Sequence, residues 1–157
     1  MKNTRYLVQA AIIAAIYASL TIVLMPLSYG VMQVRVSEAL TILPAFTPAA
    51  IPGLFVGCLV ANIVGPYGVM DMVLGSIATL LAALCSYRLR DRQWLVPLPP
   101  VIANGLIIGA MLHYAYGLPV SLPACILWVA LGEALACYGI GFPLMKYLNK
   151  RKTLFRL

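Results

Sequence analysis

The stretch Met32–Pro44, MQVRVSEALTILP, places two opposite charges, Arg35 and Glu38, three residues apart in an otherwise apolar neighbourhood. No charged residue follows between positions 39 and 70. Charged side chains are costly within a bilayer, so those found there usually have a partner or a function. The interpretation of this chain therefore depends on whether the stretch lies in a membrane, and on how many spans surround it.

The composition is that of an integral membrane protein. Of the 157 residues, 63% are hydrophobic and 10% are charged. A soluble domain has about 45–50% apolar and about 25% charged residues. No long polar segment separates the apolar runs, so we expect one membrane domain covering residues 1–157.

The formal charge of +7 comes mainly from three basic clusters. Eight of the eleven basic residues lie in these clusters, which are Lys2 and Arg5; Arg88, Arg90 and Arg92; and Lys150, Arg151 and Lys152. Basic clusters that flank apolar spans face the cytoplasm. We therefore interpret the charge as a signal of topology and not of nucleic-acid binding.

The number of spans follows from parity. Residues 39–70 are interrupted by Pro44, Pro48, Pro52 and Pro66; the segment is too long for one helix and too short for two full-length helices. The first two basic clusters share a membrane face only if an even number of spans separates them. The apolar runs 7–25 and 70–87 account for two of these spans, so the residues between them must hold an even number more. We therefore expect two short helices there, 37–46 and 49–64.

We therefore predict an all-α membrane protein with six transmembrane helices and both termini in the cytoplasm. The remaining two spans are predicted at residues 99–116 and 121–148. The first run is too long for the apolar region of a signal peptide, so we expect a permanent span. Ser37 is expected to cap the second helix, with Glu38 in its first turn.

The charges outside the clusters predict a small-molecule site. Glu133 lies near the middle of the last span, where a carboxylate is expected to face the interior of the bundle. Arg35, Glu38, Asp71 and His113 are expected near the outer side, above Glu133. Three carboxylates against one arginine favour a cationic ligand or one with several N–H donors. Further amide and aromatic contacts are expected from Asn62, Asn104, Tyr67 and Trp128.

Each of these residues also has a simpler structural interpretation. Arg35 and Glu38 could pair only with each other, and Asp71 could be no more than a first-turn residue of its helix. Glu133 could be a structural carboxylate that is paired with Asn104 or with a tyrosine. Tyr67 and Trp128 could serve as packing or interfacial residues.

The first span carries two adjacent rows of small residues, Ala10, Ala14 and Ala18 and then Ala11, Ala15 and Ser19. Small residues at this spacing let another helix approach closely in lipid. The rows indicate either packing within the chain or a docking face for a different subunit.

Catalytic patterns are absent from the sequence. It contains no GxxxxGK[ST], HExxH or GxSxG motif, so it predicts neither an enzyme nor ATP use by this chain alone. The four cysteines lie in apolar runs without ligand spacing and are expected to be small buried residues. We expect no cofactor and no metal ion.

Several segments resemble the QueT-type proteins. These segments are MQVRVSEALTILP, then NIVGPYG followed by Asp71, and GEALACYGIG around Glu133. The alanine-rich face of the first span is similar to the docking motif of S components, the substrate-binding subunits of energy-coupling factor (ECF) transporters. The resemblance implies an S-component fold in the bacterial cytoplasmic membrane. It also implies two kinds of partner, a membrane scaffold subunit and two cytoplasmic ATPases.

The implied substrate is a queuosine precursor, 7-aminomethyl-7-deazaguanine. Its amine is cationic near neutral pH, and its guanine-like edge offers two adjacent N–H donors that one carboxylate can accept. We assign Glu133 to this edge and either Glu38 or Asp71 to the amine. The nitrile precursor and queuine remain open as substrates. An alternative function is a stand-alone ion-coupled carrier in which Glu133 relays the ion.

Overall fold

Apolar runs of the expected lengths form the helices of this chain. The computed structural model describes residues 2–29 and 34–151, so Met32, Gln33 and Lys152 lie outside the described residues. In chain order the elements are α1 (Lys2–Val23), α2 (Met25–Ser28), the 3-10 helix η1 (Val36–Ala45), α3 (Ala50–Val64), α4 (Gly68–Arg88), the 3-10 turn η2 (Gln93–Leu95), α5 (Leu98–Tyr114), α6 (Leu122–Ala134), the π-helical η3 (Leu135–Gly141) and α7 (Phe142–Asn149).

Among the described residues, four helices are long and apolar enough to cross a membrane: Asn3–Val23, Gly68–Arg88, Gln93–Tyr114 and Leu122–Asn149. The prediction of two short apolar helices between the first and second of these is confirmed by η1 and α3. A helix of 15 residues such as α3 is about 22 Å long, which is less than the roughly 30 Å of a hydrocarbon core. The count of six spans therefore stays a prediction.

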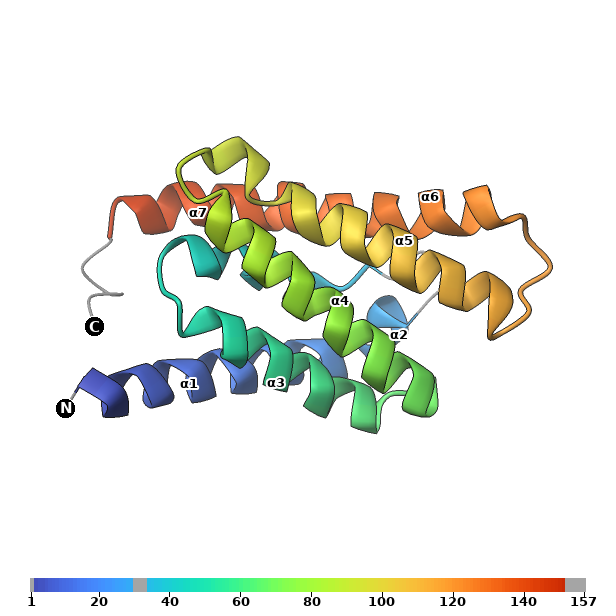
Figure 1. Ribbon diagram of the computed structural model, residues 1–157, viewed down its shortest axis with the longest axis horizontal. Coiled ribbons are helices and arrows are strands. Elements are labelled where there is room, and N and C mark those ends of the chain that lie inside the picture. Colours follow the sequence, from blue (N-terminus) through green and yellow to red (C-terminus); the bar gives the residue numbers. More distant parts are fainter. Residues whose placement is uncertain (1, 30–33, 152–157) are drawn as a thin grey trace.

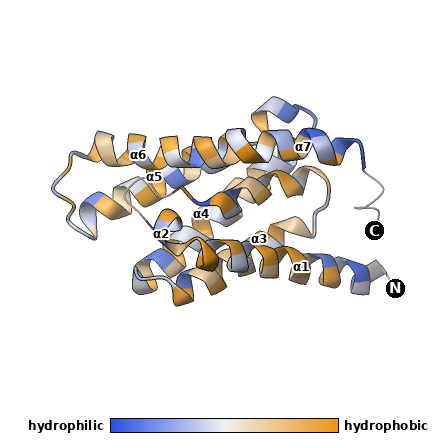
Figure 2. Ribbon diagram, turned by 180° about the vertical axis from the view of Figure 1, so that it is seen from behind, coloured by the Kyte–Doolittle hydropathy of each residue, from blue (hydrophilic) through white to orange (hydrophobic). Residues whose placement is uncertain are grey.

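The described residues of the three basic clusters, which exclude Lys152, gather at one end of the bundle. Figure 1 shows the start of α1, the connection from α4 to α5 and the end of α7 at the same end. The α3–α4 turn and the α5–α6 loop lie at the opposite end. Figure 2 shows hydrophilic residues at the tips of α1 and α7 and hydrophobic residues along the helices between the ends. The cytoplasmic orientation of the basic end remains a prediction.

The two rows of small residues on α1 have different surroundings. The row of Ala10, Ala14 and Ala18 packs toward α3, where a Cβ on Gly53 would lie 2.7 Å from the Ala10 carbonyl oxygen. A Cβ on Gly57 would lie 2.8 Å from the Ala14 carbonyl oxygen. The row of Ala11, Ala15 and Ser19 is exposed. The first row therefore packs within the chain, and the second is open on the surface.

The 3-10 helix η1 lies among α1, α3, α4, η3 and α7. Ile42 is fully buried there. The prediction that Ser37 caps this helix is wrong, because Arg35 occupies the cap position and no side chain caps the helix. The Ser37 hydroxyl instead lies 2.6 Å from the hydroxyl of Thr21, which ties η1 to α1.

The last predicted span is helical from Leu122 onward but changes its winding after Ala134, one residue beyond Glu133. Residues 135–141 form a π-helical segment, and such segments are frequent at functional sites. Gly141 approaches η1 so closely that a Cβ would lie 3.0 Å from the Ala39 carbonyl oxygen. The 3-10 helix η1, which carries Glu38, and the π-helical η3, which follows Glu133, therefore pack against each other.

The cysteines follow the prediction with one exception. Cys58, Cys125 and Cys137 are buried. The prediction is wrong for Cys85, which lies on the outer face of α4 and is exposed.

Candidate substrate-binding site

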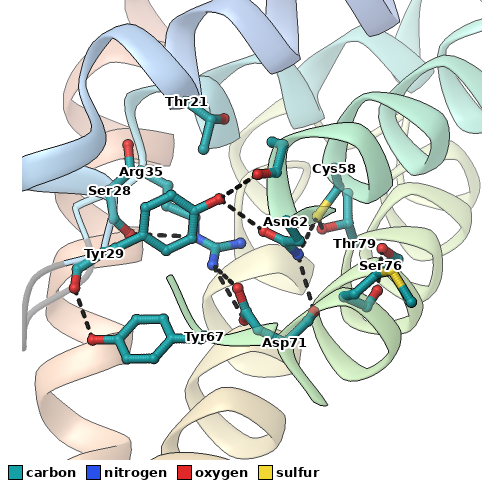
Figure 3. Close-up of polar contacts among 12 residues, drawn as sticks. Thr21, Ser28, Tyr29, Arg35, Cys58, Asn62, Tyr67, Asp71, Ser76 and Thr79 are labelled. Atoms are coloured by element: carbon teal, nitrogen blue, oxygen red, sulfur yellow. Dashed lines mark hydrogen bonds and ion pairs between the residues drawn. The ribbon is translucent and has the colours of Figure 1, made fainter. Parts of the chain in front are cut away.

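Arg35 and Asp71 form a buried ion pair that joins η1 to α4 (Figure 3). The Arg35 Nη2 atom lies 3.0 Å from Asp71 Oδ2 and 3.3 Å from Oδ1. Arg35 is 2% exposed and Asp71 is fully buried. The alternative in which Arg35 pairs with Glu38 is therefore wrong. Asp71 does lie in the first turn of α4, and it also holds Arg35.

A wall of polar and aromatic groups surrounds this pair. The Tyr29 ring centre lies 5.0 Å from the Arg35 guanidinium carbon, and the Tyr29 hydroxyl lies 3.1 Å from Asn62 Oδ1. Asn62 Nδ2 donates to the Asp71 carbonyl oxygen at 3.0 Å. Gly75 leaves the room for this arrangement, because a Cβ there would lie 2.7 Å from Asn62 Nδ2. Burial raises the pKa of Tyr29 to about 12, so its hydroxyl remains a donor at neutral pH.

Three tyrosines link the chain segments above the pair. The Tyr67 hydroxyl donates to the Tyr29 carbonyl oxygen at 2.8 Å, and the Tyr116 hydroxyl donates to the Tyr67 carbonyl oxygen. Their ring centres lie 5.9 Å (Tyr29 to Tyr67) and 5.1 Å (Tyr67 to Tyr116) apart. This ladder joins the end of α2, the α3–α4 turn and the α5–α6 loop, at the end opposite the basic clusters.

Glu38 lies deeper, on η1, and is fully buried. Its Oε1 atom accepts hydrogen bonds from the Tyr17 hydroxyl and, at 3.4 Å, from the Thr79 hydroxyl. Its Oε2 atom has no hydrogen-bond partner among the described residues. One acceptor of this carboxyl group is therefore unused.

Glu133 lies beside Glu38 and is 1% exposed. The thiol of Cys137 connects the two residues, since its sulfur lies 3.8 Å from Glu133 Oε2 and 3.5 Å from the Glu38 carbonyl oxygen. The Asn104 side chain is close to the Glu133 carboxyl group. The Asn104 Nδ2 atom, however, makes no hydrogen bond of ordinary geometry in the described part of the chain.

The charges of this cluster do not balance. Within residues 2–29 and 34–151, Arg35–Asp71 is the one ion pair, so Glu38 and Glu133 are buried carboxyl groups without a cationic side-chain partner. Burying an unpaired carboxylate is costly, and such groups concentrate at functional sites. The arrangement can accept a cation or several N–H donors from a ligand.

The structure brings together seven of the nine predicted site residues. Arg35, Asp71, Asn62 and Tyr67 form the outer part, whereas Glu38, Glu133 and Asn104 form the inner part. Apart from Tyr67, none of these side chains is more than 3% exposed, so the cluster is enclosed.

His113 and Trp128 are not placed with the cluster. His113 Nδ1 lies 2.8 Å from the Val120 carbonyl oxygen and fastens the α5–α6 loop. Trp128 is 37% exposed on α6. Neither residue has a recorded contact with Arg35, Glu38 or Glu133 in the described part of the chain.

Several site residues were not singled out from the sequence, although their spacing carried a signal. Gly75 and Thr79 follow the predicted Asp71 at intervals of four on one face of α4. Cys137 likewise follows Glu133 by four residues. Tyr17 had no comparable signal, because its contact with Glu38 bridges 21 positions of the chain.

A family model described as the QueT transporter matches residues 7–150, a range that contains every residue of the cluster. The chain belongs to the QueT transporter family. This QueT family member is 29% identical to a protein of Lactococcus lactis subsp. cremoris (strain MG1363) named "Queuosine precursor transporter QueT", with 98% of each chain aligned. No solved structure gives a significant match. Family membership and the apolar helices make it a membrane transport protein, not an enzyme.

Proposed function

We propose that this QueT family member is the S component of an ATP-driven ECF importer in the bacterial cytoplasmic membrane, and that it binds 7-aminomethyl-7-deazaguanine. The observation that carries the proposal is the pair of buried carboxyl groups, Glu38 and Glu133, which form no ion pair within the described residues. The name of the Lactococcus relative supports a queuosine precursor as the class of substrate.

Polar atoms of the cluster, two of them without a hydrogen-bond partner among the described residues, match the polar groups of this ligand. Glu133 accepts the two adjacent N–H donors of the guanine-like edge in a charge-assisted bidentate contact. The Oε2 atom of Glu38 accepts the ligand ammonium, and Asn104 Nδ2 donates to the ligand carbonyl oxygen. Asp71 is less suited to the amine, because both of its oxygens already face Arg35.

Arg35 and Asp71 serve in this proposal as a positioning pair. They hold Tyr29 and Asn62 in place and form the wall between the ligand and the tyrosine ladder. Ligand entry requires a local change in the helices that carry the carboxyl groups. The elements that change are the π-helical segment after Glu133 and the 3-10 helix that carries Glu38, because neither has ordinary α-helical hydrogen bonding.

The partners are a membrane scaffold subunit and two cytoplasmic ATPases, since the sequence has no nucleotide-binding motif. Of the five alanines predicted for docking, Ala11 and Ala15 are the exposed ones. Ala10, Ala14 and Ala11 line a surface groove of about 230 Å³ between α1 and α3. Ala18 is buried and contributes to packing within the chain.

The Ala15→Trp substitution tests the docking face. We expect the variant to lose co-purification with the scaffold subunit and ATP-driven uptake in vesicles, because an indole on the exposed row blocks close approach of another helix. Ligand binding by the isolated variant should persist, since Ala15 is exposed and has no recorded contact with the acidic cluster. Leu127→Trp is the matched control, because it places an indole at an exposed position of α6. Assembly that survives Ala15→Trp would contradict the docking assignment.

The same vesicle assay distinguishes an ATP-driven importer from a stand-alone ion-coupled carrier. The observation that favours a carrier is the buried Glu133, which forms no ion pair among the described residues. We expect no uptake by this chain alone under a proton gradient, and uptake with ATP once the partners are present. Proton-driven uptake without partners would favour the carrier and contradict the S-component role.

A further inference from the structure

A second apolar groove, which shares no lining residue with the acidic cluster, lies between α4 and α5 at the basic end of the bundle. It has a volume of about 270 Å³ and opens on the surface of the helix bundle. Its lining contains no charged residue and consists of Leu81, Ala82, Cys85, Leu89, Leu98, Pro99, Ile102 and Ala103. Such a groove fits a long apolar chain.

Three arginines border this groove. Leu89 lines it and lies between Arg88 and Arg90 in the chain, and Arg92 follows in the same connection. All three arginines are exposed, and Asp91 is the one acidic residue among positions 88–92. Arg88 follows Leu81 by seven residues and Cys85 by three, so it shares their face of α4. The groove therefore has an apolar body and a positively charged mouth.

Two aromatic residues, Tyr87 and Trp94, lie close to these arginines in the chain. The Arg90 guanidinium carbon lies 4.6 Å from the centre of the Tyr87 ring. Trp94 is 63% exposed beside the arginines, and tryptophan is enriched at the level of the lipid headgroups. The arginines thus lie where a phospholipid phosphate would be found.

We propose that this groove is a binding site for an anionic phospholipid, with one acyl chain between α4 and α5 and the headgroup phosphate at Arg88 and Arg92. Basic pockets between transmembrane helices bind anionic headgroups in this way. A zwitterionic lipid fits less well, because its headgroup cation would lie among three arginines. The site shares no residue with the acidic cluster, so it does not depend on the proposed substrate.

Cys85 provides a direct probe, because it lines the groove and is exposed while Cys58, Cys125 and Cys137 are buried. The experiment follows alkylation of the delipidated full chain by a maleimide in detergent, using intact mass. We expect phosphatidylglycerol to slow alkylation about tenfold more than phosphatidylcholine with the same acyl chains at equal mole fraction. Inorganic phosphate should not protect Cys85 from alkylation, and 0.5 M salt should reduce the difference between the two lipids. Cys85→Ser identifies the labelled site.

The double variant Arg88→Gln/Arg92→Gln should lose the preference for phosphatidylglycerol, whereas Arg5→Gln, an exposed basic residue at the same end, should keep it. Native mass spectra give a second measurement, in which the wild type retains phosphatidylglycerol and the double variant does not. Equal protection by both lipids, protection by phosphate alone, or an unchanged preference in the double variant would overturn the proposal.

Discussion

The Glu133→Gln substitution should weaken binding of 7-aminomethyl-7-deazaguanine about 100-fold or more without destabilising the unliganded protein. In the complex, the carboxylate accepts the two N–H donors of the guanine-like edge, and a hydrogen bond to a charged group contributes about 1.5–3 kcal/mol. In the free protein the same carboxylate forms no ion pair in the part of the chain that the structure describes, so replacing it with an amide relieves an unfavourable burial. Calorimetric binding and thermal unfolding in detergent measure the two effects.

Glu38→Gln should behave in the same way, because the amide oxygen can still accept from Tyr17 and Thr79 while the unused acceptor is lost. Asp91→Asn is the matched control, since it changes an exposed acid in the α4–α5 connection and should affect neither measurement. Normal binding by Glu133→Gln, or a strong loss of stability, would show that this carboxylate is structural.

Asp71→Asn should have the opposite effect on the free protein. The substitution leaves the Arg35 guanidinium buried without its counter-ion, which costs about 3–5 kcal/mol. For a chain of this length we expect a fall of about 10 °C in the midpoint of thermal unfolding. Thermal unfolding of the purified variant in detergent, in the absence of ligand, checks this result.

A second substitution should rescue this loss. The double variant Arg35→Met/Asp71→Leu removes both charges, and replacing a buried ion pair with apolar groups of similar volume is often neutral or stabilising. We expect the double variant to recover most of the lost unfolding temperature. It should also retain ligand binding, because the Arg35–Asp71 pair positions Tyr29 and Asn62 and does not hold the ligand. A double variant that stays stable but binds nothing would assign Arg35 or Asp71 to direct ligand contact.

Much of the helical arrangement was predictable, because the bilayer imposes strong constraints on length and charge. The two short helices followed from the prolines in residues 39–70 together with the parity of the basic clusters, and η1 and α3 confirm them. The actual partner of Ser37 was not predictable, since its hydroxyl contacts Thr21 across 16 positions of the chain instead of capping the helix. The π-helical segment at residues 135–141 was not predicted either; it ends at Gly141, which packs closely against Ala39, and no local pattern encodes this contact.

The acidic residues of the site were predictable for a similar reason. A carboxylate in an apolar run such as LWVALGEALACY stands out in the sequence, and so do Arg35, Glu38 and Asp71. Their pairing was not predictable, because Arg35 and Glu38 are close in the chain and yet Arg35 bonds to Asp71, 36 positions away. His113 was grouped with the acids because its helix end was expected near the outer side, and Trp128 as a candidate aromatic contact; the structure gives neither a contact with the acids among the described residues.

Titration of the purified, folded chain with 7-aminomethyl-7-deazaguanine by calorimetry is the most direct test of the proposed site. We expect saturable binding of one ligand per chain, and weaker binding of the nitrile precursor, which lacks the ammonium that Glu38 accepts. Absence of detectable binding to protein that thermal unfolding shows to be folded, or equal affinity for the amine and the nitrile, would contradict a site built from two unpaired carboxylates.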